Sequence, residues 1–135
     1  MELNIKSTLL GLISGVLFLW LYSEYFSYYI QFIPALNRSG PDFFGVKLEI
    51  LVYHWLGVGL FILLISYIAM RMLSKLGVNH NWLATFFALP FVFIHLPPFF
   101  EPPHLSFFLN SVPDVAFLLL GSYLGGKHGN QKTPL

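Results

Sequence analysis

Four long apolar segments dominate the chain, and they limit its fold more than any other feature. Hydrophobic residues make up 56% of its 135 residues, whereas Asp, Glu, Lys and Arg together make up 10%. Because a soluble domain carries roughly 25% charged residues, so few charges cannot cover a surface in water. The formal net charge of +1 and the absence of a basic run exclude nucleic acid as a partner. The sequence therefore predicts an integral membrane protein, with the lipid bilayer as its first partner.

The lengths of the apolar segments match membrane-spanning helices, which need about 20 residues to cross the bilayer. We expect helices at about 8–30, 48–70, 82–96 and 105–124. The third segment is the shortest and contains Pro90, so a re-entrant hairpin is an alternative for it. The expected fold class is an all-α integral membrane protein, a bundle of four transmembrane helices with short loops. Residues 1–126 would form this membrane domain, and residues 127–135 would form a polar cytoplasmic tail.

The basic residues of the loops predict the orientation of the bundle. If all four segments cross, both termini share a side with the loop between the second and third helices. That side holds five of the seven basic residues, and the opposite side holds Arg38 and Lys47. Since an excess of Lys and Arg marks the cytoplasmic side, we expect both termini in the cytoplasm. If the third segment were re-entrant, the cytoplasmic side would hold three basic residues and the outer side four. The excess on the cytoplasmic side would be lost, so the basic residues favour four crossings. The five residues are Lys6, Arg71, Lys75, Lys127 and Lys132.

The few acidic and histidine side chains gather near the outer end of the expected bundle. At about 1.5 Å of rise per residue, each helix places one of them within ~10 Å of the outer boundary. These four residues are Glu24, His54, His95 and Asp114. Glu101 and His104 follow in a proline-rich loop, whose extended backbone would hold them over the mouth of the bundle.

Titratable groups within a membrane usually mark a pathway or a site. We therefore expect these six residues to form an outer-facing polar pocket that binds or passes a proton, a cation or a small polar ligand. Simpler explanations stay open. Glu24 lies near enough to the interface to reach water, and Asp114, which follows Pro113, could cap the start of the fourth helix.

Two further classes of function remain as alternatives. One reason to keep them is that the pocket has no visible continuation across the membrane. The inner halves of the helices contain no acid or histidine, so transport would require an oligomer or a partner. A non-catalytic accessory or structural subunit of a larger membrane complex is the main alternative, because 15 Phe, 7 Tyr and 3 Trp offer packing surfaces.

The third hypothesis is a haem- or metal-binding membrane protein or an intramembrane enzyme. His54 and His95 could ligate a haem iron, or a divalent metal together with carboxylates. No HxxxH or similar local pair is present, and the sequence requires no cofactor. No serine lies in a G-x-S-x-G context, so the sequence does not favour an enzyme.

Small residues at helical spacing predict close contacts between helices. Gly11 and Gly15 form a GxxxG pattern, which lets membrane helices approach closely. Packing within the chain and a homo-oligomer through these glycines are both open explanations. On the fourth helix, Gly121 and Gly125 lie on the same side as Asp114.

Overall fold

The computed structural model is built almost entirely of helices. It describes residues 2–31, 42–43, 46–95 and 105–130, with side chains over 5–31, 50–95 and 111–129. Strands β1 (Asp42–Phe43) and β2 (Val46–Lys47) form a short antiparallel pair before the second long helix. The predicted all-α class is confirmed. The helical elements are α1 (Glu2–Ile30), α2 (Leu48–His54), the π-helix η2 (Trp55–Gly59), α3 (Leu60–Leu73), the 3-10 turn η3 (Ser74–Leu76), α4 (His80–His95) and α6 (Leu105–Asn130).

Two helices are long and apolar enough to cross a membrane. The first is Ile5–Ile30, with a mean hydropathy of 1.6. The second is Ile50–Leu76, with a mean hydropathy of 2.1, in which α2, η2, α3 and η3 follow one another without a break. α4 is shorter, with 16 residues, or about 24 Å of helix. It continues through Pro90, so this segment contains no turn of the kind that a re-entrant hairpin needs.

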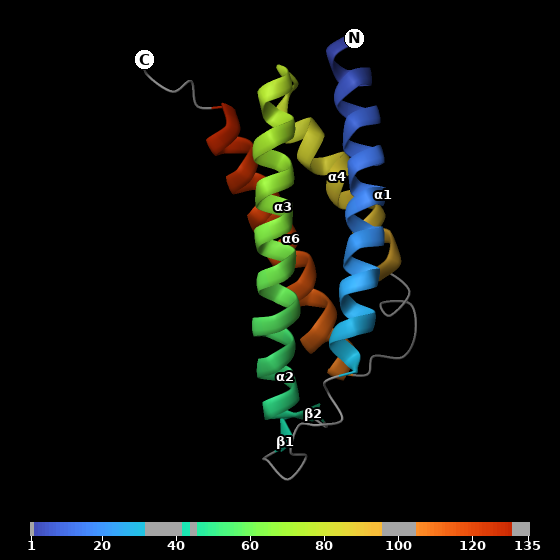
Figure 1. Ribbon diagram of the computed structural model, residues 1–135, viewed down its shortest axis with the longest axis vertical. Coiled ribbons are helices and arrows are strands. Elements are labelled where there is room, and N and C mark those ends of the chain that lie inside the picture. The colour runs from blue at the N-terminus through green and yellow to red at the C-terminus, as the bar shows by residue number, and fades with distance from the viewer. Residues whose placement is uncertain (1, 32–41, 44–45, 96–104, 131–135) are drawn as a thin grey trace.

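The helices pack as two pairs (Figure 1). α1 lies along α4 and α3 lies along α6, while α4 and α6 join the two pairs. α1 and α3 touch only lightly. The start of α1, the end of α6 and the turn between α3 and α4 lie at one end of the bundle, and the β1–β2 pair lies at the other. α6 runs to Asn130, so the first residues of the segment expected as a tail are helical.

A short turn reverses the chain between α3 and α4. Gly77 ends η3 in the left-handed conformation, with a φ of 72°, which glycine adopts without a steric penalty. The side-chain oxygen of Asn79 then accepts hydrogen bonds from the backbone N–H groups of Asn81 and Trp82, at 3.1 and 3.2 Å. This bonding caps the start of α4. The turn therefore places α4 antiparallel to α3.

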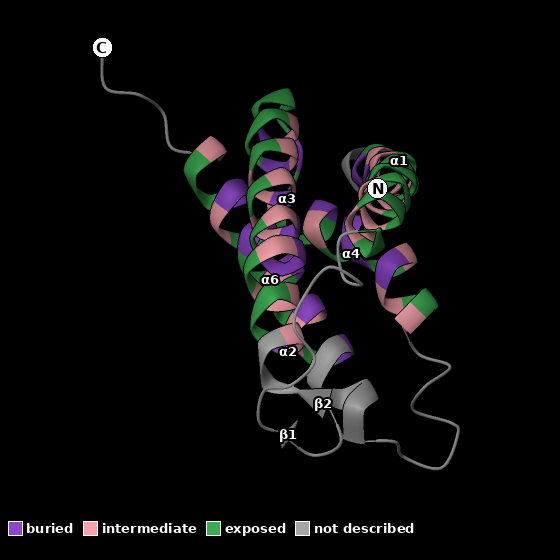
Figure 2. Ribbon diagram, turned by 60° about the horizontal axis from the view of Figure 1, so that its bottom comes forward, coloured by how far each residue is buried: buried purple, intermediate pink, exposed green. Residues whose placement is uncertain are grey.

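Apolar residues occupy both the interior and the outside of the bundle. Phe18, Phe87 and Phe91 lie in the core, and the Phe18 ring contacts the rings of the other two. In Figure 2 the buried stretches turn toward neighbouring helices and the exposed stretches turn outward. The exposed stretches still carry large apolar side chains, such as Leu64, which is 58% exposed, and Phe93, which is 68% exposed. Helices that are apolar on all sides are typical of membrane spans.

Glycines set the closest contacts within both helix pairs. A Cβ at Gly11 would lie 2.9 Å from the Leu83 carbonyl oxygen of α4, and one at Gly15 would lie 2.5 Å from the Phe87 carbonyl oxygen. In the other pair, a Cβ at Gly121 would lie 2.5 Å from a backbone oxygen of α3. Packing within the chain therefore explains the GxxxG pattern. Self-association stays a prediction, and α4 already covers these two glycines.

Candidate functional site

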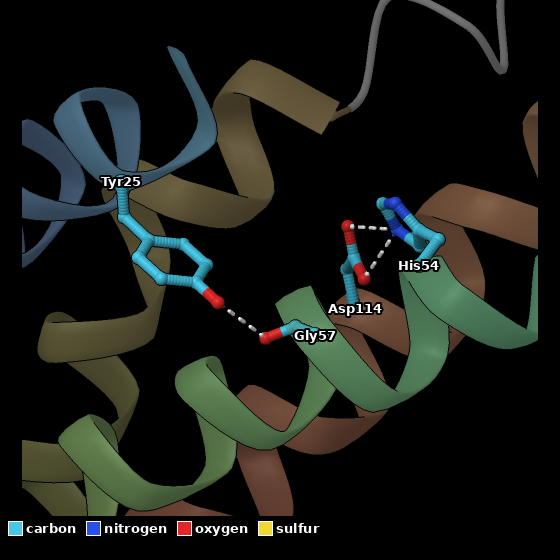
Figure 3. A network of polar contacts seen from close by, with 4 residues as sticks. All are labelled: Tyr25, His54, Gly57 and Asp114. Carbon is cyan, nitrogen blue, oxygen red and sulfur yellow. Dashed lines mark hydrogen bonds and ion pairs between the residues drawn. The ribbon is translucent and has the colours of Figure 1, made fainter. Parts of the chain in front are cut away.

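His54 and Asp114 lie 60 residues apart in the sequence and meet near one end of the bundle (Figure 3). The Nε2 atom of His54 lies 3.0 Å from Oδ1 of Asp114 and 3.2 Å from Oδ2, so its N–H donates to the carboxylate. The side chains are only 11% and 3% exposed. Since a buried carboxylate without a partner is strongly unfavourable, this contact makes the burial of Asp114 possible.

An irregular stretch of helix adjoins each member of the pair. His54 is the last residue of α2, and η2 begins at the next residue. A π-turn holds one residue more than an α-turn, so it rotates the preceding residues by about 100° relative to those that follow. Asp114 follows Pro113, which has no N–H to donate within α6. Such π-turns occur frequently at functional sites.

The structure excludes a capping role for Asp114. α6 begins at Leu105, so Asp114 lies inside the helix rather than at its start. Its carboxylate contacts a side chain of another helix instead of the free backbone N–H groups of its own. The alternative that Asp114 caps the fourth helix is therefore wrong.

Tyr25 supports the π-helix beside His54 (Figure 3). Its hydroxyl donates a hydrogen bond of 3.0 Å to the Gly57 carbonyl oxygen, which lies within η2. The Tyr25 ring stacks on Phe61, with 3.9 Å between ring centroids. Gly57 leaves room for Tyr29, because a Cβ there would lie 2.5 Å from a carbon of that ring. The sequence predicts Tyr25 only as one of several tyrosines near the membrane interface. It does not predict the hydrogen bond from Tyr25 to Gly57.

His95 lies close to the pair but does not bind it directly. Its Nδ1–H donates to the Phe91 carbonyl oxygen at 2.8 Å, and its ring stacks on the Phe91 ring. A row of ring contacts connects His95 to His54 through Tyr22 and Phe26, with centroid distances of 6.2, 5.7 and 6.3 Å. Within the part of the chain that the structure describes, no three His, Cys, Asp or Glu side chains gather to hold a metal ion.

The other predicted residues lie apart from this cluster. Glu24 is exposed, and it has no hydrogen bond or ion pair to any residue that the structure describes. Glu101 and His104 lie outside the described residues. Of the six candidates, the structure thus joins His54 to Asp114 and places His95 nearby.

The interior beside the pair is closed by apolar side chains. Val58 of η2, Ile62 of α3 and Leu118 of α6 follow the pair along the chain, and each is 0% exposed. On this side the pair therefore borders a buried apolar interior. No protein family, curated protein or solved structure matches this chain. Its function must therefore be inferred from this geometry.

Proposed function

We propose that the protein is a small multi-pass membrane protein in which His54 and Asp114 bind and release a proton. In this proposal four helices cross the bilayer, both termini lie in the cytoplasm, and the pair faces the opposite side. The two apolar helices of membrane-spanning length support the placement, as does the apolar outer surface. The five-to-two distribution of basic residues supports the orientation.

The buried contact between imidazole and carboxylate carries the proposal. Imidazole is the side chain whose charge changes most readily near neutral pH. With His54 protonated, the contact is an ion pair; with His54 neutral, it is a hydrogen bond from the ring N–H to the carboxylate. His54 is 11% exposed, which leaves the ring an access for protons that the 3% exposed Asp114 lacks. A metal ion would need further ligands, and the described residues supply none at hydrogen-bond range.

Proton binding at this site would change the contact between two helices. Protonation of His54 would add the attraction between two opposite charges to the existing hydrogen bond, so it would tighten the contact between α2 and α6. Tyr25 ties the adjoining π-helix to α1, which extends the effect to a third helix. Because Val58, Ile62 and Leu118 close the interior, the site is suited to sensing or gating. Passage of a proton across the membrane would require another subunit.

The test is a ¹⁵N NMR titration of His54 in the protein reconstituted into nanodiscs. We expect the His54 ring resonances to change reversibly when the ring gains or loses a proton, together with backbone amides of α2 and α6 around the pair. In Asp114→Asn, which keeps the shape of the side chain, the amide changes should disappear. His54 ring resonances that do not respond to pH would contradict the proposal.

A cavity between α1 and α3 favours the accessory subunit as a second candidate. It has a volume of about 320 Å³ and an apolar lining that includes Leu17, Phe18, Ile65 and Ala69. The side chain of a partner helix would fit between these two lightly packed helices. Gentle solubilisation followed by mass photometry separates the two candidates. A fixed larger complex would favour the accessory role, and the chain alone or with copies of itself would favour the proton site.

A further inference from the structure

A second cavity lies between α4 and α6, away from the His54–Asp114 pair. It has a volume of about 290 Å³. Its lining comes from the first half of α4 and the second half of α6, so it lies toward the end of the bundle that holds the α3–α4 turn (Figure 1). None of the lining residues is charged. They are Asn81, Ala84, Thr85, Leu119, Ser122 and Tyr123.

Ser122 lines this cavity, and its buried hydroxyl is unpaired. Its side chain is 1% exposed, and its Oγ atom has no hydrogen-bond partner among the residues that the structure describes. Four other serine and threonine hydroxyls in the helices bond to their own backbone. Ser14, Ser66, Ser74 and Thr85 each donate to a carbonyl oxygen three or four residues earlier. Since a buried polar group without a partner is unfavourable, Ser122 is suited to a partner that enters the cavity.

The chemistry of the lining indicates an uncharged hydrogen-bond acceptor. The Thr85 hydroxyl already donates its hydrogen to the Asn81 carbonyl oxygen, at 2.8 Å. Ser122 therefore offers a free buried O–H donor, which a carbonyl oxygen would satisfy. Ala84 and Leu119 add apolar surface beside it. A ligand with an acceptor next to a hydrocarbon chain matches this arrangement.

Aromatic residues place the cavity near the surface of the bilayer. Tyr123 lines the cavity and is 54% exposed, and Trp82 at the start of α4 is 42% exposed. Exposed Tyr and Trp side chains gather at membrane interfaces. In a bilayer this region holds the ester carbonyls of the phospholipids, directly above their acyl chains.

We propose that this cavity binds the glycerol-ester region of one phospholipid. The Ser122 hydroxyl donates a hydrogen bond to an ester carbonyl, and the acyl chain lies along Ala84 and Leu119. This inference rests on the proposed membrane placement, and it is independent of the proton site. Ser122 binds the ester carbonyl, which ether-linked chains lack. A lipid with the same headgroup and ether-linked chains should therefore bind more weakly.

The experiment compares diester and diether phosphatidylcholine by native mass spectrometry of the protein in mixed micelles. Loss of one neutral hydrogen bond corresponds to a change on the order of five-fold, so we expect a preference of about that size for the diester lipid. Ser122→Ala should abolish the preference. Ser27→Ala is the matched control, because this exposed serine donates to the Ser23 carbonyl of its own helix. It should retain the preference, and circular dichroism checks that both variants stay folded.

Two results would overturn the lipid site. Equal binding of both lipids to the unmodified protein would show that Ser122 is satisfied by water or by its own helix. A preference that persists in Ser122→Ala would place the carbonyl elsewhere. Alkaline carbonate extraction tests the membrane placement separately. Release of the protein from membranes would contradict that placement and the lipid site together, whereas retention with equal lipid binding would overturn the lipid site alone.

Discussion

A double-mutant cycle on His54 and Asp114 tests whether their contact contributes to stability. Asp114→Ala leaves the ring N–H of His54 without its acceptor, which costs ~1–3 kcal/mol. His54→Ala leaves a carboxylate that is 3% exposed without a partner, and breaking a buried pair in this way costs ~3–5 kcal/mol. The double variant removes both groups, so no unpaired group remains. Its loss of unfolding free energy should therefore fall short of the sum of the single losses by about 2 kcal/mol.

The assay is reversible unfolding in detergent micelles, followed by circular dichroism for the four proteins of the cycle. Tyr67 and His128 provide a matched control, because their side chains join α3 to α6 much as those of His54 and Asp114 join α2 to α6, with 2.8 Å between Oη and Nδ1. That contact is exposed, so its coupling energy should stay below about 1 kcal/mol. Losses at His54 and Asp114 that add within ~0.5 kcal/mol would refute the argument that the two groups stabilise each other.

Three further substitutions test the packing around the site. Tyr25→Phe removes only the hydroxyl that bonds to the Gly57 carbonyl, so the unfolding free energy should fall by ~1 kcal/mol, and amide exchange in η2 should accelerate in hydrogen-exchange mass spectrometry. Gly15→Ala directs a Cβ at the backbone of α4, so thermal unfolding should show a loss of ~1–3 kcal/mol; an unchanged midpoint would contradict the helix pairing. Glu24→Gln should leave the unfolding free energy unchanged, because Glu24 is exposed and unpaired among the described residues.

The level of the candidate site along the bundle could be predicted from the sequence. Counting residues from the expected helix ends placed His54, His95 and Asp114 at one depth, and their ring and hydrogen-bond contacts agree with that depth. Helical phase was also informative. Glu24 comes nine residues after Gly15, which puts the two nearly opposite at about 100° per residue. Gly15 contacts α4, and Glu24 is exposed.

The contact between His54 and Asp114 could not be predicted from the sequence. It depends on which helices are neighbours, and no local pattern specifies that α3 lies along α6. It also depends on the π-helix, which shifts the phase of His54 by one residue relative to α3. An expectation of regular helix from 48 to 70 therefore assigns the wrong face to residues before the π-turn. For the same reason the hydrogen bond from Tyr25 into that turn had no signal in the sequence.

Cysteine accessibility in intact cells tests the central claim, a membrane bundle whose proton site opens away from the cytoplasm. The protein contains no cysteine, so single substitutions have no labelling background. With a small membrane-impermeant thiol reagent, we expect rapid labelling of Ser39→Cys, slower labelling of His54→Cys, and labelling of Lys75→Cys only after the membrane is permeabilised. Labelling of Lys75→Cys in intact cells without labelling of Ser39→Cys would reverse the orientation. A His54→Cys variant that reacts only after permeabilisation would contradict a proton site open to the outside.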